Sequence, residues 1–205
     1  MAGPATRVPF IGLTGGLGAG KSTALAALAQ LGAATLSTDE VVHELLTGRE
    51  LRDEVVARLG DGVASPEGGL DRGAIASRVF ESPEDREWLE GLLWPRVGQR
   101  VVEFRTEVDA NYLPPPAAVV EVPLLFEAEM QDAFDHTVAV VAEEQARAER
   151  AGGRGHEGIE GRAGRQLSQE EKSQRADFTV RNDGTEEELE RELASLLVRI
   201  GPEAH

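Results

Sequence analysis

The sequence predicts an α/β fold of the P-loop NTPase type, in which helices flank a parallel sheet. Three observations favour this fold. A phosphate-binding pattern, GGLGAGKST, stands at residues 15–23. Short apolar segments alternate with helix-forming ones, as in right-handed βαβ units. Two of the apolar segments, AAVVEV and TVAVVA, are nearly continuous hydrophobic runs, as strands covered on both faces are.

The first unit is predicted as a strand at 8–14 and a helix at 22–31, on either side of the phosphate-binding loop. The strand VPFIGLT is apolar, and Pro9 stands near its start, where a missing backbone N–H is tolerated. The helix STALAALAQL is rich in alanine and leucine, which favour helices. Strand, loop and helix in this order are the setting that such a loop requires.

The loop matches G-x-x-x-x-G-K-[ST] and is therefore predicted to bind the phosphates of ATP. Glycines let several backbone N–H groups converge on a polyphosphate, and the next helix offers its positive end. Lys21 is expected to reach the β- and γ-phosphates, and Ser22 to bind Mg²⁺. The chain has two lysines, Lys21 and Lys172, which favours this interpretation over a chance glycine-rich turn. The predicted nucleotide contacts are Gly16, Gly18, Ala19, Gly20, Lys21, Ser22 and Thr23.

The remaining elements continue the alternation. A strand is predicted at 34–37, followed by helices at 40–46, 50–59, 70–79 and 95–108. Ser82-Pro83-Glu84 is a further helix-start signal. Buried strands are predicted at 117–122 and 137–142, a helix from about 143, a strand at 178–180 and an amphipathic helix at 186–200.

The composition of the 205 residues limits the classes of function. A net charge of −16 argues against general nucleic-acid binding, which depends on neutralising phosphates. The lack of cysteine excludes disulfides, thiol catalysis and cysteine metal sites. No segment has the apolar length of a membrane span, and no signal-peptide pattern is present. We therefore expect a cytoplasmic protein without nucleic-acid or membrane partners; the sequence does not predict its oligomeric state.

Two carboxylates stand at the ends of predicted strands, and each has two interpretations. Asp39 follows the strand at 34–37, expected beside the first strand, so it either caps the next helix or acts on a substrate at that edge. Glu121 ends another buried strand, where it either assists Mg²⁺ or accepts hydrogen bonds from backbone amides. The residues alone leave both alternatives open.

The segment at 150–165 concentrates arginine and glycine in an otherwise acidic chain. One interpretation is a solvated surface loop. The other is a lid whose arginines fold over bound phosphates, adding positive charge and excluding water so that the donor is not hydrolysed.

Six further stretches accompany the loop. They are STDEVVHELL at 37–46, LDRGAIASRVFESPEDREWLEGLLWPRV at 70–97, EVPLLFE at 121–127, EQARAER at 144–150, RAGRQLSQEEK at 162–172 and ADFTVRNDG at 176–184. With these motifs the chain resembles the dephospho-coenzyme A kinase family along nearly its whole length. The P-loop is shared by many families, but the LDR helix, the PLLFE loop and the terminal segment together are specific. One departure is Trp94, which precedes Pro95 where the family usually has histidine.

This resemblance implies an ATP-dependent phosphorylation of the ribose 3′-hydroxyl of dephospho-coenzyme A, the last step of coenzyme A synthesis. It implies that Asp39 accepts the proton of the attacking hydroxyl. By the same resemblance, Arg150 and Arg162 are lid residues on the phosphates, and Asn182 lies in the segment that flanks the adenine.

The resemblance also implies one kinase domain over residues 1–205, with a helical acceptor-binding region at about 40–112 and a lid at about 144–170. The main alternative is another P-loop nucleoside or nucleotide kinase. A GTPase would carry N-K-x-D and an ABC-type ATPase L-S-G-G-Q, and the sequence has neither motif. A non-catalytic nucleotide-binding protein would lack an acid near the phosphates, whereas Asp39 and Glu121 are both present.

Overall fold

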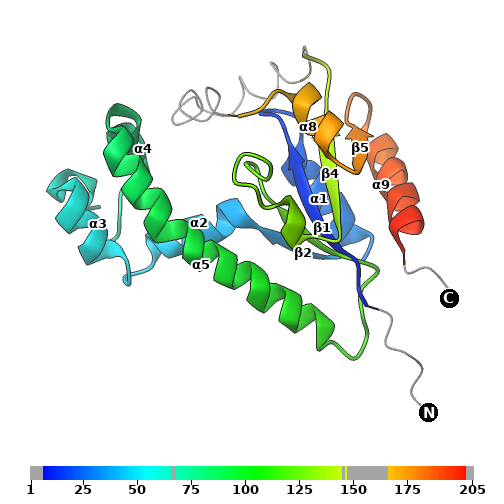
Figure 1. The fold of residues 1–205 in the computed structure, drawn as a ribbon, viewed down its shortest axis with the longest axis horizontal. Helices are drawn as coiled ribbons and strands as arrows, with labels where there is room; N and C mark the ends of the chain where they lie inside the picture. Colours follow the sequence, from blue (N-terminus) through cyan, green and yellow to red (C-terminus); the bar gives the residue numbers. More distant parts are fainter. Residues whose placement is uncertain (1–6, 66–67, 145, 147–165, 202–205) are drawn as a thin grey trace.

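The centre of the computed structural model is a five-stranded parallel sheet with the strand order β2-β3-β1-β4-β5 (Figure 1). The structure describes residues 7–65, 68–144, 146 and 166–201. The strands are β1 Phe10–Gly15, β2 Ala34–Ser37, β3 Ala118–Glu121, β4 His136–Val141 and β5 Phe178–Arg181. The predicted α/β fold, a parallel sheet flanked by helices, is confirmed.

The helices connect these strands and extend beyond the sheet. The described α-helices are α1 Lys21–Gln30, α2 Thr38–Thr47, α3 Arg52–Leu59, α4 Arg72–Glu81, α5 Pro83–Asp109, α8 Gln169–Arg175 and α9 Glu186–Ile200. Two short 3₁₀-helices are η1 Asp61–Val63 and η2 Gln131–Ala133. Within the described ranges, no helix combines the length and the apolarity needed to cross a membrane.

Alternate residues of the strands enter separate cores on the two faces of the sheet. On one face, Ile11 and Leu13 of β1 pack in a cluster with residues of α1 and α9. On the other face, Phe10 of β1 and Val120 of β3 pack with the C-terminal half of α5. Because both faces are covered, the strands contain continuous apolar runs instead of alternating ones.

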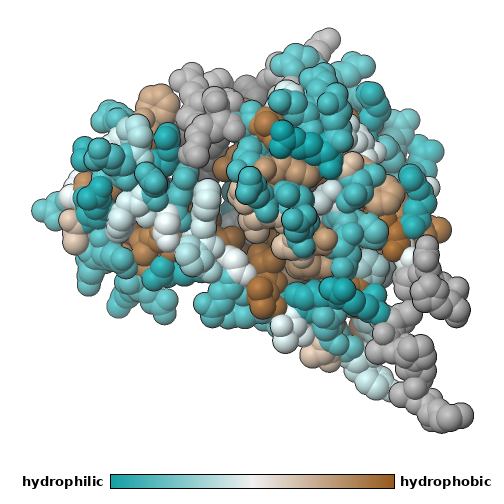
Figure 2. Space-filling model, viewed as in Figure 1, coloured by the Kyte–Doolittle hydropathy of each residue, from teal (hydrophilic) through white to brown (hydrophobic). Residues whose placement is uncertain are grey.

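A third core lies among α2, α3, α4 and the N-terminal half of α5, away from the sheet (Figure 1). Its buried side chains include Leu46, Leu51, Val55, Ile75, Leu89 and Leu93. Apart from the first two residues of α2, these helices lie within the region 40–112, for which acceptor binding stays a prediction. We call α2, α3, α4 and the N-terminal half of α5 the helical extension. The face of the molecule seen in Figure 2, including this helical extension, is mostly hydrophilic.

The longest helix differs from its prediction, because α5 spans 27 residues and contains Pro95 in its interior. The sequence placed Pro95 at the start of a separate helix at 95–108. The apolar stripe continues across the proline, with Leu92 and Leu93 before it and Val97 after it, all buried. This packing stabilises the helix enough to tolerate the loss of the backbone hydrogen bond that proline cannot make.

Two other differences concern helix starts. The helix predicted from residue 40 begins at Thr38 with Ser37 as its N-cap residue, so Asp39 lies in the first turn and is not the cap. Helix α8 was not predicted, although Ser168 and Glu171 form a capping box, which is a readable start signal. The helix predicted from about 143 lies mostly outside the described residues.

Candidate active site

The phosphate-binding loop joins the end of β1 to the start of α1. Gly18 and Gly20 have positive φ angles of 73° and 90°, which residues other than glycine rarely adopt. At Gly15, an added Cβ atom would collide with the carbonyl oxygen of Val140 in β4. The backbone therefore requires glycine at positions 15, 18 and 20, as the sequence predicts.

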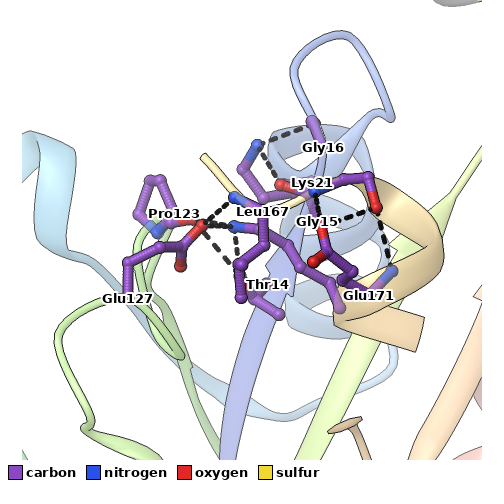
Figure 3. A network of polar contacts seen from close by, with 10 residues as sticks. Thr14, Gly15, Gly16, Lys21, Pro123, Glu127, Leu167 and Glu171 are labelled. Atoms are coloured by element: carbon purple, nitrogen blue, oxygen red, sulfur yellow. Dashed lines mark hydrogen bonds and ion pairs between the residues drawn. The ribbon is translucent and has the colours of Figure 1, made fainter. Parts of the chain in front are cut away.

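Lys21 is the first residue of α1, and its side chain lies back over the loop (Figure 3). The Nζ atom donates hydrogen bonds to the carbonyl oxygens of Gly15 and Gly16, each at 3.2 Å. This position puts the ammonium group at the mouth of the loop. Phosphate oxygens that enter the loop would meet it there.

Glu121 ends β3 at the same edge of the sheet. The Ser22 hydroxyl donates to its carboxylate at 3.4 Å, and the Thr38 hydroxyl donates to its backbone carbonyl at 2.9 Å. Only 4% of the residue is exposed, and this burial raises the pKa of the Glu121 carboxyl more than the nearby charge of Lys21 lowers it. The negative charge of Glu121 is therefore costly where it lies, and a cation bound beside it would relieve that cost.

Asp39 reaches the same place from α2, by a route that differs from the prediction. The sequence placed its strand, β2, beside β1, but β3 lies between them. In the parallel register, Ser37 at the end of β2 lies opposite Glu121 at the end of β3. The order of groups along the edge is therefore the phosphate-binding loop, then Glu121, then Asp39.

A cavity of about 600 Å³ unites these groups. Ser22, Asp39 and Glu121 all line it, although they come from three different elements. Among the described residues, no group of three or more histidine and acidic side chains forms a metal-binding cluster. Mg²⁺ bound to a nucleotide needs only one or two protein ligands, because phosphates and water supply the others.

His43 and Arg72 also line this cavity, although no role was predicted for them from the sequence. An Arg72 guanidinium nitrogen lies 2.7 Å from Nδ1 of His43. A guanidinium can only donate, so Nδ1 must accept, and the ring proton of a neutral His43 is then on Nε2. Arg72 begins α4 in the LDR motif, so the signal was present in the sequence.

Asn182 follows β5 and is almost fully buried. Its side-chain amide donates to the carbonyl oxygen of Ala19 at 3.0 Å, and its backbone N–H donates to Val141 at 2.8 Å. Asn182 therefore links the segment after β5 to the phosphate-binding loop. Its predicted place beside the adenine stays a prediction.

A second cavity, of about 440 Å³, is lined by Gly16 and Leu17 of the loop, by Glu144 and by residues 166–170. The predicted lid at 144–170 lies mostly outside the described residues. Arg150 and Arg162 are among the residues that the structure does not describe, so their roles stay predictions.

The chain is similar to known proteins over most of its length. The family model described as dephospho-CoA kinase matches residues 9–188. The dephospho-CoA kinase of Thermobifida fusca is 33% identical over 199 residues, covering 95% of this chain and 98% of the relative. That of Symbiobacterium thermophilum is 38% identical over 184 residues, covering 86% and 74%.

Two solved structures are also similar. A protein from Thermus thermophilus has a TM-score of 0.76 and 31% identity, covering 94% of this chain and 98% of that one. The dephospho-CoA kinase from Campylobacter jejuni has a TM-score of 0.68 at 23% identity, covering 93% and 96%, which supports the fold alone.

Proposed function

The chain belongs to the dephospho-CoA kinase family, and we infer that its 600 Å³ cavity is where phosphoryl transfer takes place. The enzyme phosphorylates the ribose 3′-hydroxyl of dephospho-CoA with ATP, giving coenzyme A and ADP in the final step of coenzyme A biosynthesis. One observation supports this placement above all others. The cavity brings Ser22 of the phosphate-binding loop together with two carboxylates, Asp39 and Glu121.

We propose that Asp39 accepts the proton of the 3′-hydroxyl and holds that oxygen in line with the γ-phosphate. Its place in the first turn of α2, on the cavity wall, supports this role. A positioned base of this kind accelerates a reaction by about 10² to 10⁴. Lys21, at the mouth of the loop, offsets the negative charge of the group in transfer.

Ser22 and Glu121 fit a Mg²⁺ site. Both present oxygen ligands, which Mg²⁺ prefers, and the raised pKa of the buried Glu121 carboxyl indicates a place where positive charge is stabilising. When bound, the ion supplies positive charge to the nucleotide phosphates.

Arg72 and His43 fit the diphosphate of the acceptor. The cavity wall also includes the carboxylates of Asp39, Glu40 and Glu121, which repel an anionic substrate. Asp39 and His43 are four residues apart in α2, a rise of about 6 Å, and so lie on the same face of the helix. The diphosphate of dephospho-CoA is attached to the same ribose as the 3′-hydroxyl, so both contacts are within reach of one bound molecule.

The function is tested by a coupled ADP-release assay with dephospho-CoA as the acceptor. We expect ADP to form only with both acceptor and Mg²⁺, and ³¹P NMR to place the new phosphate on the 3′-oxygen. Adenosine and other plain nucleosides serve as matched acceptors that lack the diphosphate. Equal turnover with these nucleosides would instead support the alternative of a nucleoside kinase. Arg150, Arg162 and the cytoplasmic location stay predictions.

A further inference from the structure

The two strands that carry the active site are paired as far as Leu13 and Glu121 and separate just beyond them. The last backbone hydrogen bond between them is from the Val122 N–H to the Leu13 carbonyl, at 2.8 Å. Beyond it, β1 continues through Thr14 into the phosphate-binding loop, and β3 continues through Pro123 into the PLLFE loop. The sheet itself does not join these two segments after this point.

The ammonium group of Lys172, from α8, lies at the point of separation. Its Nζ atom donates to the Pro123 carbonyl oxygen, lies 3.5 Å from the Thr14 hydroxyl, and forms an ion pair of 3.0 Å with Glu127. Thr14, Pro123 and Glu127 gather around one point in Figure 3. The three N–H donors of the ammonium thus meet oxygens from two diverging segments.

This arrangement costs stability. The Lys172 side chain is fully buried, and desolvation lowers its pKa although the charge of Glu127 raises it. Glu127 also accepts a hydrogen bond from the Leu167 N–H at 2.8 Å, and its second carboxylate oxygen is buried without a hydrogen bond to the described residues. A buried ion pair is often no more stabilising than apolar residues of similar volume.

We propose that Lys172 is a positioning residue for phosphoryl transfer, which fixes the P-loop entry at Thr14 against the strand end that carries Glu121. Pro123 is two residues from Glu121, and Thr14 immediately precedes the first glycine of the loop. A change in their separation would therefore alter the Ser22–Glu121 distance, now 3.4 Å. A misplacement of about 1 Å can reduce a rate a hundredfold.

The choice of lysine supports this role. The chain has 21 basic residues, of which only Lys21 and Lys172 are lysines. Both contact the segment at 14–16, since Lys21 binds the Gly15 and Gly16 carbonyls and Lys172 lies at Thr14. A compact ammonium can face acceptors in three directions, whereas a planar guanidinium cannot.

The inference rests on the phosphoryl transfer proposed above, and its test uses Lys172→Met, Glu127→Gln and the double variant. Lys172→Met alone leaves Glu127 buried without its cation, so we expect a lower Tm and a lower kcat. The double variant removes both charges, so we expect its Tm to recover toward wild type. Its kcat should stay at least tenfold below wild type, with a smaller change in KM for ATP, because only the long 3.4 Å hydrogen bond from the Thr14 hydroxyl to the Pro123 carbonyl oxygen then joins the segments.

Thr137→Val is the matched control. Thr137 is buried at the other end of the sheet, at the start of β4, where its hydroxyl bonds Asp177 at 2.8 Å. The control should lower Tm without changing kcat, provided that all variants are assayed well below their melting temperatures. If kcat of the double variant lies within about fivefold of wild type, the pair has only a structural role and the inference is wrong. Failure of the proposed function is distinct, since wild type itself would then release no ADP with dephospho-CoA.

Discussion

Glu121 and Glu127 lie six residues apart in the EVPLLFE segment, yet the charged groups around their two carboxylates differ. Glu127 faces the ammonium of Lys172 at 3.0 Å and the backbone N–H of Leu167. Glu121 lines the cavity with Asp39, and its pKa is raised because burial outweighs the attraction of Lys21. The Glu127 carboxylate thus forms an ion pair with a buried side chain of the protein, whereas the Glu121 carboxylate accepts a hydrogen bond from Ser22 and is the proposed ligand of Mg²⁺.

The contrast distinguishes charges that stabilise the fold from charges that serve ligand binding. Around Glu127, charges are paired within the chain, so the removal of one partner alone should lower stability as well as rate. Around Glu121, like charges have gathered in a cavity, and their removal should lower activity while the fold stays as stable or becomes more so. Four substitutions in the cavity region test this distinction.

The largest effect is expected from Lys21→Ala. Turnover should fall by several powers of ten, because the ammonium offsets charge that develops during transfer. The circular dichroism spectrum and the melting temperature should stay close to wild type, in contrast to Lys172→Met. Turnover within about tenfold of wild type would show that Lys21 has no such role.

Asp39→Asn should lower kcat at least a hundredfold by removing the proton acceptor. Because Ser37 is the N-cap residue of α2, the substitution removes no cap, and the lost interaction with the helix dipole is worth only about 0.3–1 kcal/mol. Tm and ATP affinity should therefore be nearly unchanged. Glu44→Gln, an exposed position of the same helix outside the cavity, is the control. A fully active Asn variant would leave Glu121 as the next candidate for the base.

Arg72→Ala should raise KM for dephospho-CoA about tenfold and change kcat by less than about threefold, since binding to the diphosphate is similar in the ground and transition states. Initial rates at varied acceptor concentration measure this split. Arg49→Ala, an exposed arginine of the same helical extension that does not line the cavity, should leave KM unchanged. An unaltered KM in Arg72→Ala would place the diphosphate elsewhere.

The smallest effect is expected from Glu121→Gln in the absence of Mg²⁺, where the substitution should raise Tm at high pH. The carboxyl has its ordinary value of 4.5 in the unfolded chain and a raised pKa in the folded one, so wild type loses stability as pH rises from about 4.5 through the raised value. The Gln variant has no such loss. Its Tm should match wild type near pH 4 and exceed it by a few degrees near pH 8. A lower Tm for the variant at pH 8 would contradict this account of Glu121.

Features that depend on residues close together in the chain could be predicted from the sequence alone. The P-loop glycines, Lys21 and Ser22 lie within nine residues, and their pattern predicted the nucleotide site. Ser82-Pro83-Glu84 predicted a helix start correctly, because a capping side chain bonds a backbone N–H only three residues away. The resemblance of several such motifs also identified the family, which the comparisons confirm.

Which of these groups come into contact could be learned only from the folded structure. Ser22 and Glu121 are 99 residues apart, and Thr14 and Lys172 are 158 apart. The sequence placed β2 beside β1, and the insertion of β3 between them is what puts Glu121 between the P-loop and Asp39. Local patterns record interactions among near neighbours, whereas strand order and the burial of Lys172 follow from packing energy summed over the whole chain.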